Sequence, residues 1–431
     1  MFPELFSTLF SGVPATALAT GEKMIKKVTL DKLRPGIFIH DFNCGWKSGN
    51  LILQPTLVKD RKIIDILSSW GIREVYIDTD KGLDVKEALP ALEERRDTEK
   101  ALRQFAEENP AIAKNIPLKE ELVSAKKIKN QAVKVVHGAM ENVRAGKPLE
   151  TAGAYRLIAE MEESILRNRD ALVLLSRIRK KDEYTLMHSI SVCAQILNFC
   201  NFHRLPRKRI QGLAIGALFH DIGKTRIPLA ILNKPGRLDD EEWTEMKCHT
   251  LYSAKILETA KDMPRVAFDV GLHHHERYDG SGYPHGLKGD AITVGAQLVA
   301  IADVYDATIS DRCYRNGMDR VEVLVSLYQW AGTYFNKDLT HKFIRSIGVY
   351  PIGTCVRLES GRIGVVVGST ESMVQPIVRI FHDERKKAAL PIHDLDLSKT
   401  EDQVVGYEDQ ARWDIKGMNI FGGMTSDLFA V

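Results

Sequence analysis

Residues 212–228 read GLAIGALFHDIGKTRIP, an apolar helical run that ends in His220 and Asp221. When such a helix packs, a histidine and an aspartate at its end lose contact with water, so both need hydrogen-bonding partners or a metal ion. An imidazole offers one nitrogen to a metal, and a carboxylate can bridge two ions through its two oxygens. The stretch therefore predicts a helical core built around a polar or metal-binding pair.

Histidines gather around this pair. The chain has 13 histidines, and seven of them lie between His188 and His275, where an even spread would place about three. His188 lies on a separate amphipathic helix, and Asp303 sits in the apolar run LVAIADVYDATIS. With His220 and Asp221, they would supply most of one metal's ligands from three helices. The alternative is a set of helix-capping acids and core histidines.

A second group of histidines follows. His249 lies in the helical KCHTLYSAKIL, and residues 273–276 read HHHE. Neighbours on a helix point about 100° apart, so only two of the three consecutive histidines can reach one metal. If Asp221 bridges the two groups, the result is a two-metal site, which suits attack on a phosphoryl group by a metal-bound hydroxide. His203, in the polar NFHRLPRKR, is expected at the surface.

Composition limits the class of protein. The 431 residues are 44% hydrophobic and 27% charged, with a net charge of +3, which is typical of a globular protein of two to four domains and gives no electrostatic case for binding a nucleic acid polymer. The six cysteines show no paired spacing, which favours a reducing compartment. The apolar first twenty residues carry Glu4 and lack a basic segment, which argues against a signal peptide. We therefore expect a cytoplasmic protein without a membrane span.

Changes of pattern along the chain predict its organisation. Residues 24–80 alternate short strands, turns and one helix, 81–120 form a charged helical linker, and 121–347 are helical apart from the glycine-rich YDGSGYPHGLKGD. Residues 351–400 have a β-strand pattern with a turn at Ser360-Gly361, and no structure is assigned to the tail at 401–431. The fold class is mainly α, with a small mixed α/β N-terminal domain and a β-rich C-terminal segment.

The motifs YTLMHS, HDIGKTRIP, HHHERYDGSGYP and ADVYDATISDRCYR follow one another in the order and spacing of the HD-GYP family. The chain resembles this family over about residues 170–345. Residues 24–80 are similar to the small domain that often precedes HD-GYP modules. The resemblance implies an HD-type helical bundle that hydrolyses the bacterial second messenger cyclic di-GMP to pGpG or GMP, at two metals bridged by a hydroxide.

The resemblance also implies roles for single residues. One metal would be held by His188, His220, Asp221 and Asp303, and the second by Asp221, His249, His274 and His275, which leaves His273 spare. Lys224 would neutralise charge on the scissile phosphate; its alternative is a structural lysine at a helix end. The substrate contacts would come from Gly282, Tyr283, Pro284, Arg312 and Arg315, although a solvated surface remains open for the two arginines.

Mixed imidazole and carboxylate ligands suit Fe or Mn, with Ni or Zn as alternatives, better than Mg. Two other functions stay open: a cyclic di-GMP receptor with little turnover, and another HD-type nucleotide phosphohydrolase. The resemblance further suggests contact with diguanylate cyclase domains through the GYP loop, and a homodimer is a further possibility. No membrane partner is expected.

Overall fold

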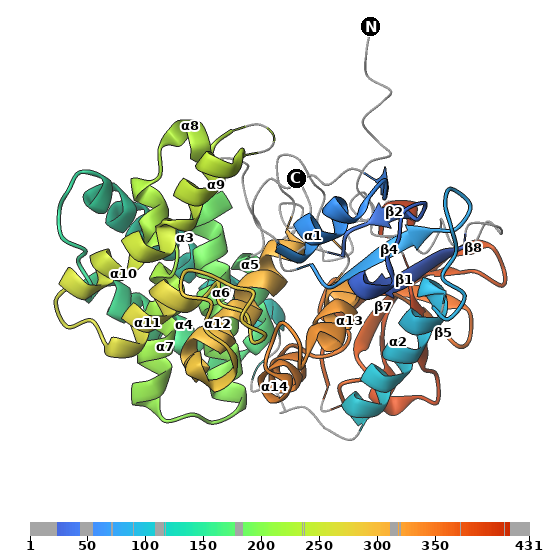
Figure 1. The fold of residues 1–431 in the computed structure, drawn as a ribbon. Coiled ribbons are helices and arrows are strands. Elements are labelled where there is room, and N and C mark those ends of the chain that lie inside the picture. Colours follow the sequence, from blue (N-terminus) through green and yellow to red (C-terminus); the bar gives the residue numbers. More distant parts are fainter. Residues whose placement is uncertain are drawn as a thin grey trace, which may run out of the picture.

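The chain folds into a set of helices and two small β-sheets, one formed near each end of the sequence (Figure 1). The computed structural model describes residues 24–43, 55–69, 72–88, 90–107, 116, 118–176, 184–234, 236, 238–310, 318, 320–370, 372–408 and 410–413. Figure 1 shows both sheets on the same side of the helical part. The predicted fold class, mainly helical with strands near both ends, is confirmed.

The N-terminal sheet has the strand order β1-β4-β2-β3, with all described pairs antiparallel. Its strands are β1 (Ile25–Thr29), β2 (Phe38–Asp41), β3 (Thr56–Leu57) and β4 (Glu74–Asp78). The amphipathic helix α1 (Arg61–Ser69) lies between β3 and β4. A separate small hydrophobic core from these elements and the segments between them, including Ile37, Ile39 and Ile77, holds them together.

The helical part provides the main core. Its longer helices are α3 (Leu118–Arg144), α4 (Ala152–Arg167), α5 (Arg169–Ser176), α6 (Tyr184–Phe202), α7 (Arg207–Phe219), α9 (Asp240–Lys247), α10 (His249–Thr259), α11 (Arg265–His273), α12 (Val294–Ile309), α13 (Arg320–Trp330) and α14 (Lys337–Ile347). Short pieces are η3 (Ile222–Arg226), α8 (Leu229–Leu232) and η4 (Gly289–Ala291). Helices α6 and α12 are buried on nearly all sides, so their few polar residues must find partners inside the protein.

The C-terminal sheet has the order β8-β7-β6-β5-β9. Its strands are β5 (Cys355–Leu358), β6 (Arg362–Gly368), β7 (Ile377–Asp383), β8 (Ala388–Asp396) and β9 (Val404–Tyr407). The predicted turn at Ser360-Gly361 connects β5 to β6, and Gly361 has a φ of 85° there. Strand β9 lies in the tail to which the sequence assigns no structure; its four residues form a strand because β5 offers them an edge.

Helix α2 (Ala91–Glu107) joins the N-terminal sheet to the rest of the chain. The sequence predicts a charged helical linker in this region, and the structure buries Leu102 of the helix in the main core. Arg95 pairs with Glu322 of α13 at 3.1 Å and lies over the ring of Tyr407 in β9. The linker therefore ties both sheets to the helical part.

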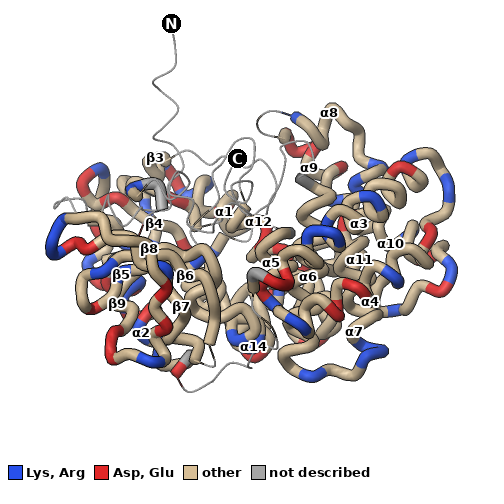
Figure 2. The backbone as a smooth tube through the Cα atoms, turned by 180° about the vertical axis from the view of Figure 1, so that it is seen from behind, with Lys and Arg blue, Asp and Glu red and all other residues tan. Residues whose placement is uncertain are grey.

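Lys and Arg are interspersed with Asp and Glu along the chain, as Figure 2 shows from behind. This mixture agrees with a net charge of only +3. Among the described residues, no helix is both long enough and apolar enough to cross a membrane.

Candidate metal centre

The predicted ligands come together from five helical elements in the interior of the helical part. They form two groups of buried side chains whose ligand atoms lie within 4.8 Å of one another: Asp221, His249, His274 and His275 in one, and His188, His220 and Asp303 in the other. His188 comes from α6, His220 and Asp221 follow α7, His249 begins α10, His274 and His275 follow α11, and Asp303 lies on α12.

Gly223 explains how Asp221 reaches His249. A Cβ at Gly223 would stand 2.0 Å from the carbonyl oxygen of His249 and 2.4 Å from the backbone nitrogen of Ser253. Its N–H donates to the Ser253 hydroxyl at 2.9 Å. Only glycine permits this approach between η3 and the start of α10, so the HDIGK sequence places its aspartate against the second histidine group.

Asp221 stands between the two groups. Its Oδ1 lies 3.4 Å from His249 Nε2 and 3.6 Å from His274 Nε2. Its Oδ2 lies 3.3 Å from His220 Nε2, and the Lys224 ammonium pairs with the same oxygen at 2.6 Å. One carboxylate oxygen therefore faces each histidine group, which is the arrangement that a bridging carboxylate requires.

The imidazole rings are oriented by backbone carbonyls. The Nδ1 of His220 donates to Ala217 O at 2.8 Å, that of His249 to Met246 O at 2.6 Å, and that of His274 to Val270 O at 3.0 Å. A carbonyl can only accept, so Nδ1 carries a proton in each of these rings, and Nε2 is the ring atom that faces Asp221.

These donors fit divalent metal ions. His220 Nε2 and Asp221 Oδ1 are buried without a hydrogen-bond partner in the described part of the chain, and buried ligand atoms of this kind are suited to binding a cation. With bonds of about 2.1 Å, two ligand atoms of one ion lie at most about 4.2 Å apart. The 2.9 Å between His188 and Asp303 satisfies this limit, as do the 3.4 and 3.6 Å that separate Asp221 from His249 and His274. The site could hold one ion in each group.

Burial and the local charges set the protonation of the ligands. Burial lowers the pKa of His249 to about 3 and places the pKa values of His274 and His275 below the ordinary value, so these rings are neutral. Burial alone would raise the pKa of Asp221, but Lys224 and His220 outweigh it and hold that pKa well below the usual range. Neutral imidazole and ionised carboxylate are the forms that bind metal ions.

His188 differs, because two carboxylates face its ring. Its Nε2 lies 2.9 Å from Asp303 Oδ1 and its Nδ1 lies 2.7 Å from Asp306 Oδ2. Burial by itself lowers the pKa of His188, but these two hydrogen bonds raise it to about 10. Sequence reasoning missed Asp306, although its position three residues after Asp303 places both carboxylates on one face of α12. Asp306 is fully buried, and Ser191 and Gln195 donate to its second oxygen.

The glycine-rich loop after His275 lies over the ligand group that contains His249, His274 and His275. A Cβ at Gly282 would lie 2.4 Å from the backbone of Glu276 and Arg277, which accounts for glycine at this position. Tyr283 stacks on His275, with ring centres 4.8 Å apart, and the peptide bond to Pro284 is cis.

Glu276, which sequence reasoning named only as part of the motif, holds this loop from inside. Its carboxylate accepts the N–H of His285 at 2.7 Å and that of Leu287 at 3.0 Å. It is almost fully buried. Glu276 therefore holds the far end of the loop, at His285 and Leu287, next to the HHHE motif.

Other predicted residues lie apart from the two groups. His273 pairs with Asp269 at 2.8 Å and with His285 at 3.1 Å, and it belongs to neither of the two ligand groups. His203 lies near the surface and bonds to Lys342 O at 3.0 Å. Arg312 and Arg315 fall outside the described residues.

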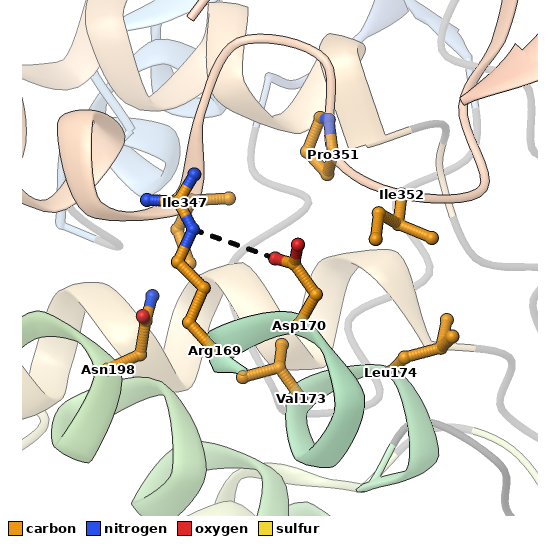
Figure 3. Close-up of a pocket in the computed structure, with 8 residues that line it drawn as sticks. All are labelled: Arg169, Asp170, Val173, Leu174, Asn198, Ile347, Pro351 and Ile352. Carbon is orange, nitrogen blue, oxygen red and sulfur yellow. Dashed lines mark ion pairs between the residues drawn. The ribbon is translucent and has the colours of Figure 1, made fainter. Parts of the chain in front are cut away.

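A small cavity elsewhere does not compete as a substrate site. Figure 3 shows it where α5 meets the segment after α14, with Arg169 and Asp170 among its lining residues. Its volume of about 20 Å³ is enough for a water molecule only. Ser369 donates to Asp170 at 2.8 Å, so the cavity lies along the junction with the C-terminal sheet.

Comparison with known proteins agrees with this geometry. The HD domain family matches residues 158–339, and a domain of unknown function, DUF3391, matches residues 25–154. A cyclic di-GMP phosphodiesterase of Pseudomonas aeruginosa is 34% identical over 406 residues, which cover 92% of this chain and 95% of that protein.

Two further relatives match the chain over shorter stretches. A cyclic di-GMP phosphodiesterase response regulator of Xanthomonas campestris is 35% identical over 198 residues, 44% of this chain and 51% of that protein. A 3'3'-cGAMP-specific phosphodiesterase of Vibrio cholerae is 32% identical over 167 residues, 38% of this chain and 32% of that protein. By its motifs, its HD domain and its match to the Pseudomonas protein along nearly the whole length of both, the chain belongs to the HD-GYP family of HD-domain phosphohydrolases.

Proposed function

We propose that this protein hydrolyses cyclic di-GMP to pGpG or GMP with two divalent metal ions, Fe or Mn, bridged by Asp221 and a hydroxide. The observation that carries the metal chemistry is the convergence of Nε2 atoms from three rings on the two oxygens of Asp221. The substrate follows from the relatives, two of which are named cyclic di-GMP phosphodiesterases.

The proposed ligands fall into two sets, one for each ion. His188, His220 and Asp303 would hold one ion, and His249, His274 and His275 the other. When bound, such ions polarise phosphoryl oxygens and lower the pKa of a coordinated water. Four of these rings, those of His188, His220, His249 and His274, would keep their orientation through the proton on Nδ1, which a backbone carbonyl or Asp306 accepts.

Lys224 lies beside the bridging carboxylate, 2.6 Å from Asp221 Oδ2, with about a quarter of its side chain exposed. A cation in this place would neutralise the charge that develops on the scissile phosphate. We place Gly282, Tyr283 and Pro284 at the substrate, because this loop covers His275. Arg312 and Arg315 are proposed as phosphate contacts on the resemblance alone.

The test is turnover by protein reconstituted anaerobically with Fe(II) or Mn(II), with products separated by chromatography. Cyclic di-GMP and 3'3'-cGAMP are compared in one assay, since relatives are named for each. His220→Ala and Asp221→Ala should abolish metal-dependent formation of pGpG or GMP. His137→Ala, an exposed histidine on α3, is the matched control and should keep full activity.

Two results would contradict the proposal. Tight binding of cyclic di-GMP without turnover by the two-metal protein would indicate a receptor. Absence of both binding and turnover would favour another nucleotide phosphohydrolase of the HD type.

A further inference from the structure

The N-terminal sheet touches the loop that covers the metal centre. The Nε of Arg73, the residue before β4, lies 2.6 Å from Asp279 Oδ2. Asp279 stands between His275 and Gly282, so this ion pair joins the domain of unknown function directly to the GYP loop.

Asp279 braces the corner of this loop. Its Oδ1 accepts the N–H of Ser281 at 2.9 Å and its hydroxyl at 2.7 Å, and its backbone forms a bridge with Lys288. Its side chain is only 8% exposed, whereas that of Arg73 is 52% exposed. Loss of Arg73 would remove the cation that pairs with this nearly buried carboxylate, and breaking such a pair is costly.

A second contact reinforces the pair. The hydroxyl of Tyr334, in the turn between α13 and α14, faces the backbone of Arg73. The carbonyl of Tyr334 accepts the N–H of Tyr278 at 2.9 Å. Arg73 thus meets the loop through Asp279 and, by way of Tyr334, through Tyr278.

The linker helix holds the sheet in this place. Arg95 of α2 pairs with Glu322 of α13, and Gln329 of α13 donates to Thr98 of α2 at 3.3 Å. Since α13 leads into the turn that carries Tyr334, the sheet, the turn and the loop are connected by short contacts on both sides.

We propose that Arg73 is a positioning residue, through which the N-terminal domain holds the GYP loop in the conformation that receives the substrate. Its kinetic test rests on the proposed function. The metal ligands lie outside this contact, so its loss should affect recognition of a large substrate more than the chemistry at the metals.

The experiment compares Arg73→Ala with Arg61→Ala, an exposed arginine of the same domain. In the metal-loaded protein, Arg73→Ala should raise the KM for cyclic di-GMP by about threefold to tenfold. Its metal content and its kcat/KM for the small diester bis(p-nitrophenyl) phosphate should stay unchanged. Arg61→Ala should behave as wild type. Arg73→Lys keeps the positive charge, so its KM for cyclic di-GMP should lie between those of wild type and Arg73→Ala.

A double-mutant cycle tests whether the pair acts as one unit. Asp279→Asn keeps an oxygen for Ser281 but loses the charge, so it should raise the KM as Arg73→Ala does, and the double variant should add little. Additive effects, or equal losses toward both substrates, would overturn the proposal. If Arg73→Ala does not fold, Asp279→Asn tests the proposal alone, through its KM for cyclic di-GMP and its kcat/KM for bis(p-nitrophenyl) phosphate.

Hydrogen exchange separates this proposal from the proposed function. Arg73→Ala should speed amide exchange in residues 277–289 and leave the helices around the metal ligands protected. If wild-type protein does not hydrolyse cyclic di-GMP, the proposed function fails, and the exchange result still tests the contact. Unchanged exchange in this loop would refute the positioning role.

Discussion

The Nε2 atoms of His249 and His274 lie 3.4 Å apart, and the Nδ1 atom of each ring donates its proton to a backbone carbonyl. Two lone pairs therefore face each other inside the protein, with Asp221 Oδ1 beside both. A cation between them would convert this repulsion into attraction, and the proposed metal binding would draw its affinity from this change.

Replacing His249 should prevent the binding of one metal ion and leave the binding of the other unchanged. The His249→Ala variant is expected to bind about one metal equivalent fewer than wild type, because the group around His188 keeps its own ligands. Elemental analysis after reconstitution measures this, with His137→Ala as the control. An unchanged metal content would show that His249 is not a ligand.

Metal binding at His188 should release a proton. The pKa of this histidine is about 10 without metal, so at neutral pH the ion must displace the proton on Nε2 that Asp303 accepts. Proton and ion compete, so affinity should rise as the pH increases from about 6 to 9. Calorimetry in buffers of different ionisation enthalpy measures the release. An affinity that does not change with pH would contradict the raised pKa.

Asp306 should act through His188. Asp306→Asn still offers an oxygen to His188 Nδ1 but removes the charge that makes the ring a better ligand. We expect metal affinity to fall by about 10- to 100-fold, measured by competition with a chelator. Asp290→Asn, at an exposed position in η4, is the matched control. Equal affinities for the two variants would exclude this role.

Gly223→Ala should damage both the fold and the site. The new methyl group would overlap the backbone of α10, so the free energy of unfolding should fall by about 1–3 kcal/mol, together with the metal content. Gly138→Ala is the control, since nothing lies within 4 Å of its Cβ position on α3. It should raise stability by roughly 0.5–1 kcal/mol. Urea unfolding compares the two, and equal stability would mean that α10 moves aside without cost.

Much of the site was predictable because its signals are local. His220 and Asp221 end an apolar helix, and His249, His274, His275 and Asp303 stand at helix ends or on buried faces. Asp306 escaped notice because an acid on an apolar helix shows its partner only after His188 packs against it. The strand β9 escaped for a similar reason, since its four residues need the edge of β5.

By itself, the sequence determined the helical class, the strand pattern near both ends and the set of buried histidines and aspartates. Helix and strand periodicity, and the placing of an ionisable group within an apolar run, depend only on residues that are close together in the chain. Only the tertiary structure decided which Asp221 oxygen faces which histidine group. It also decided the ring orientations, the partner of Asp279 and the packing of α2. These depend on contacts between residues far apart in the chain, such as the 206 positions that separate Arg73 from Asp279, and packing of whole elements sets such contacts.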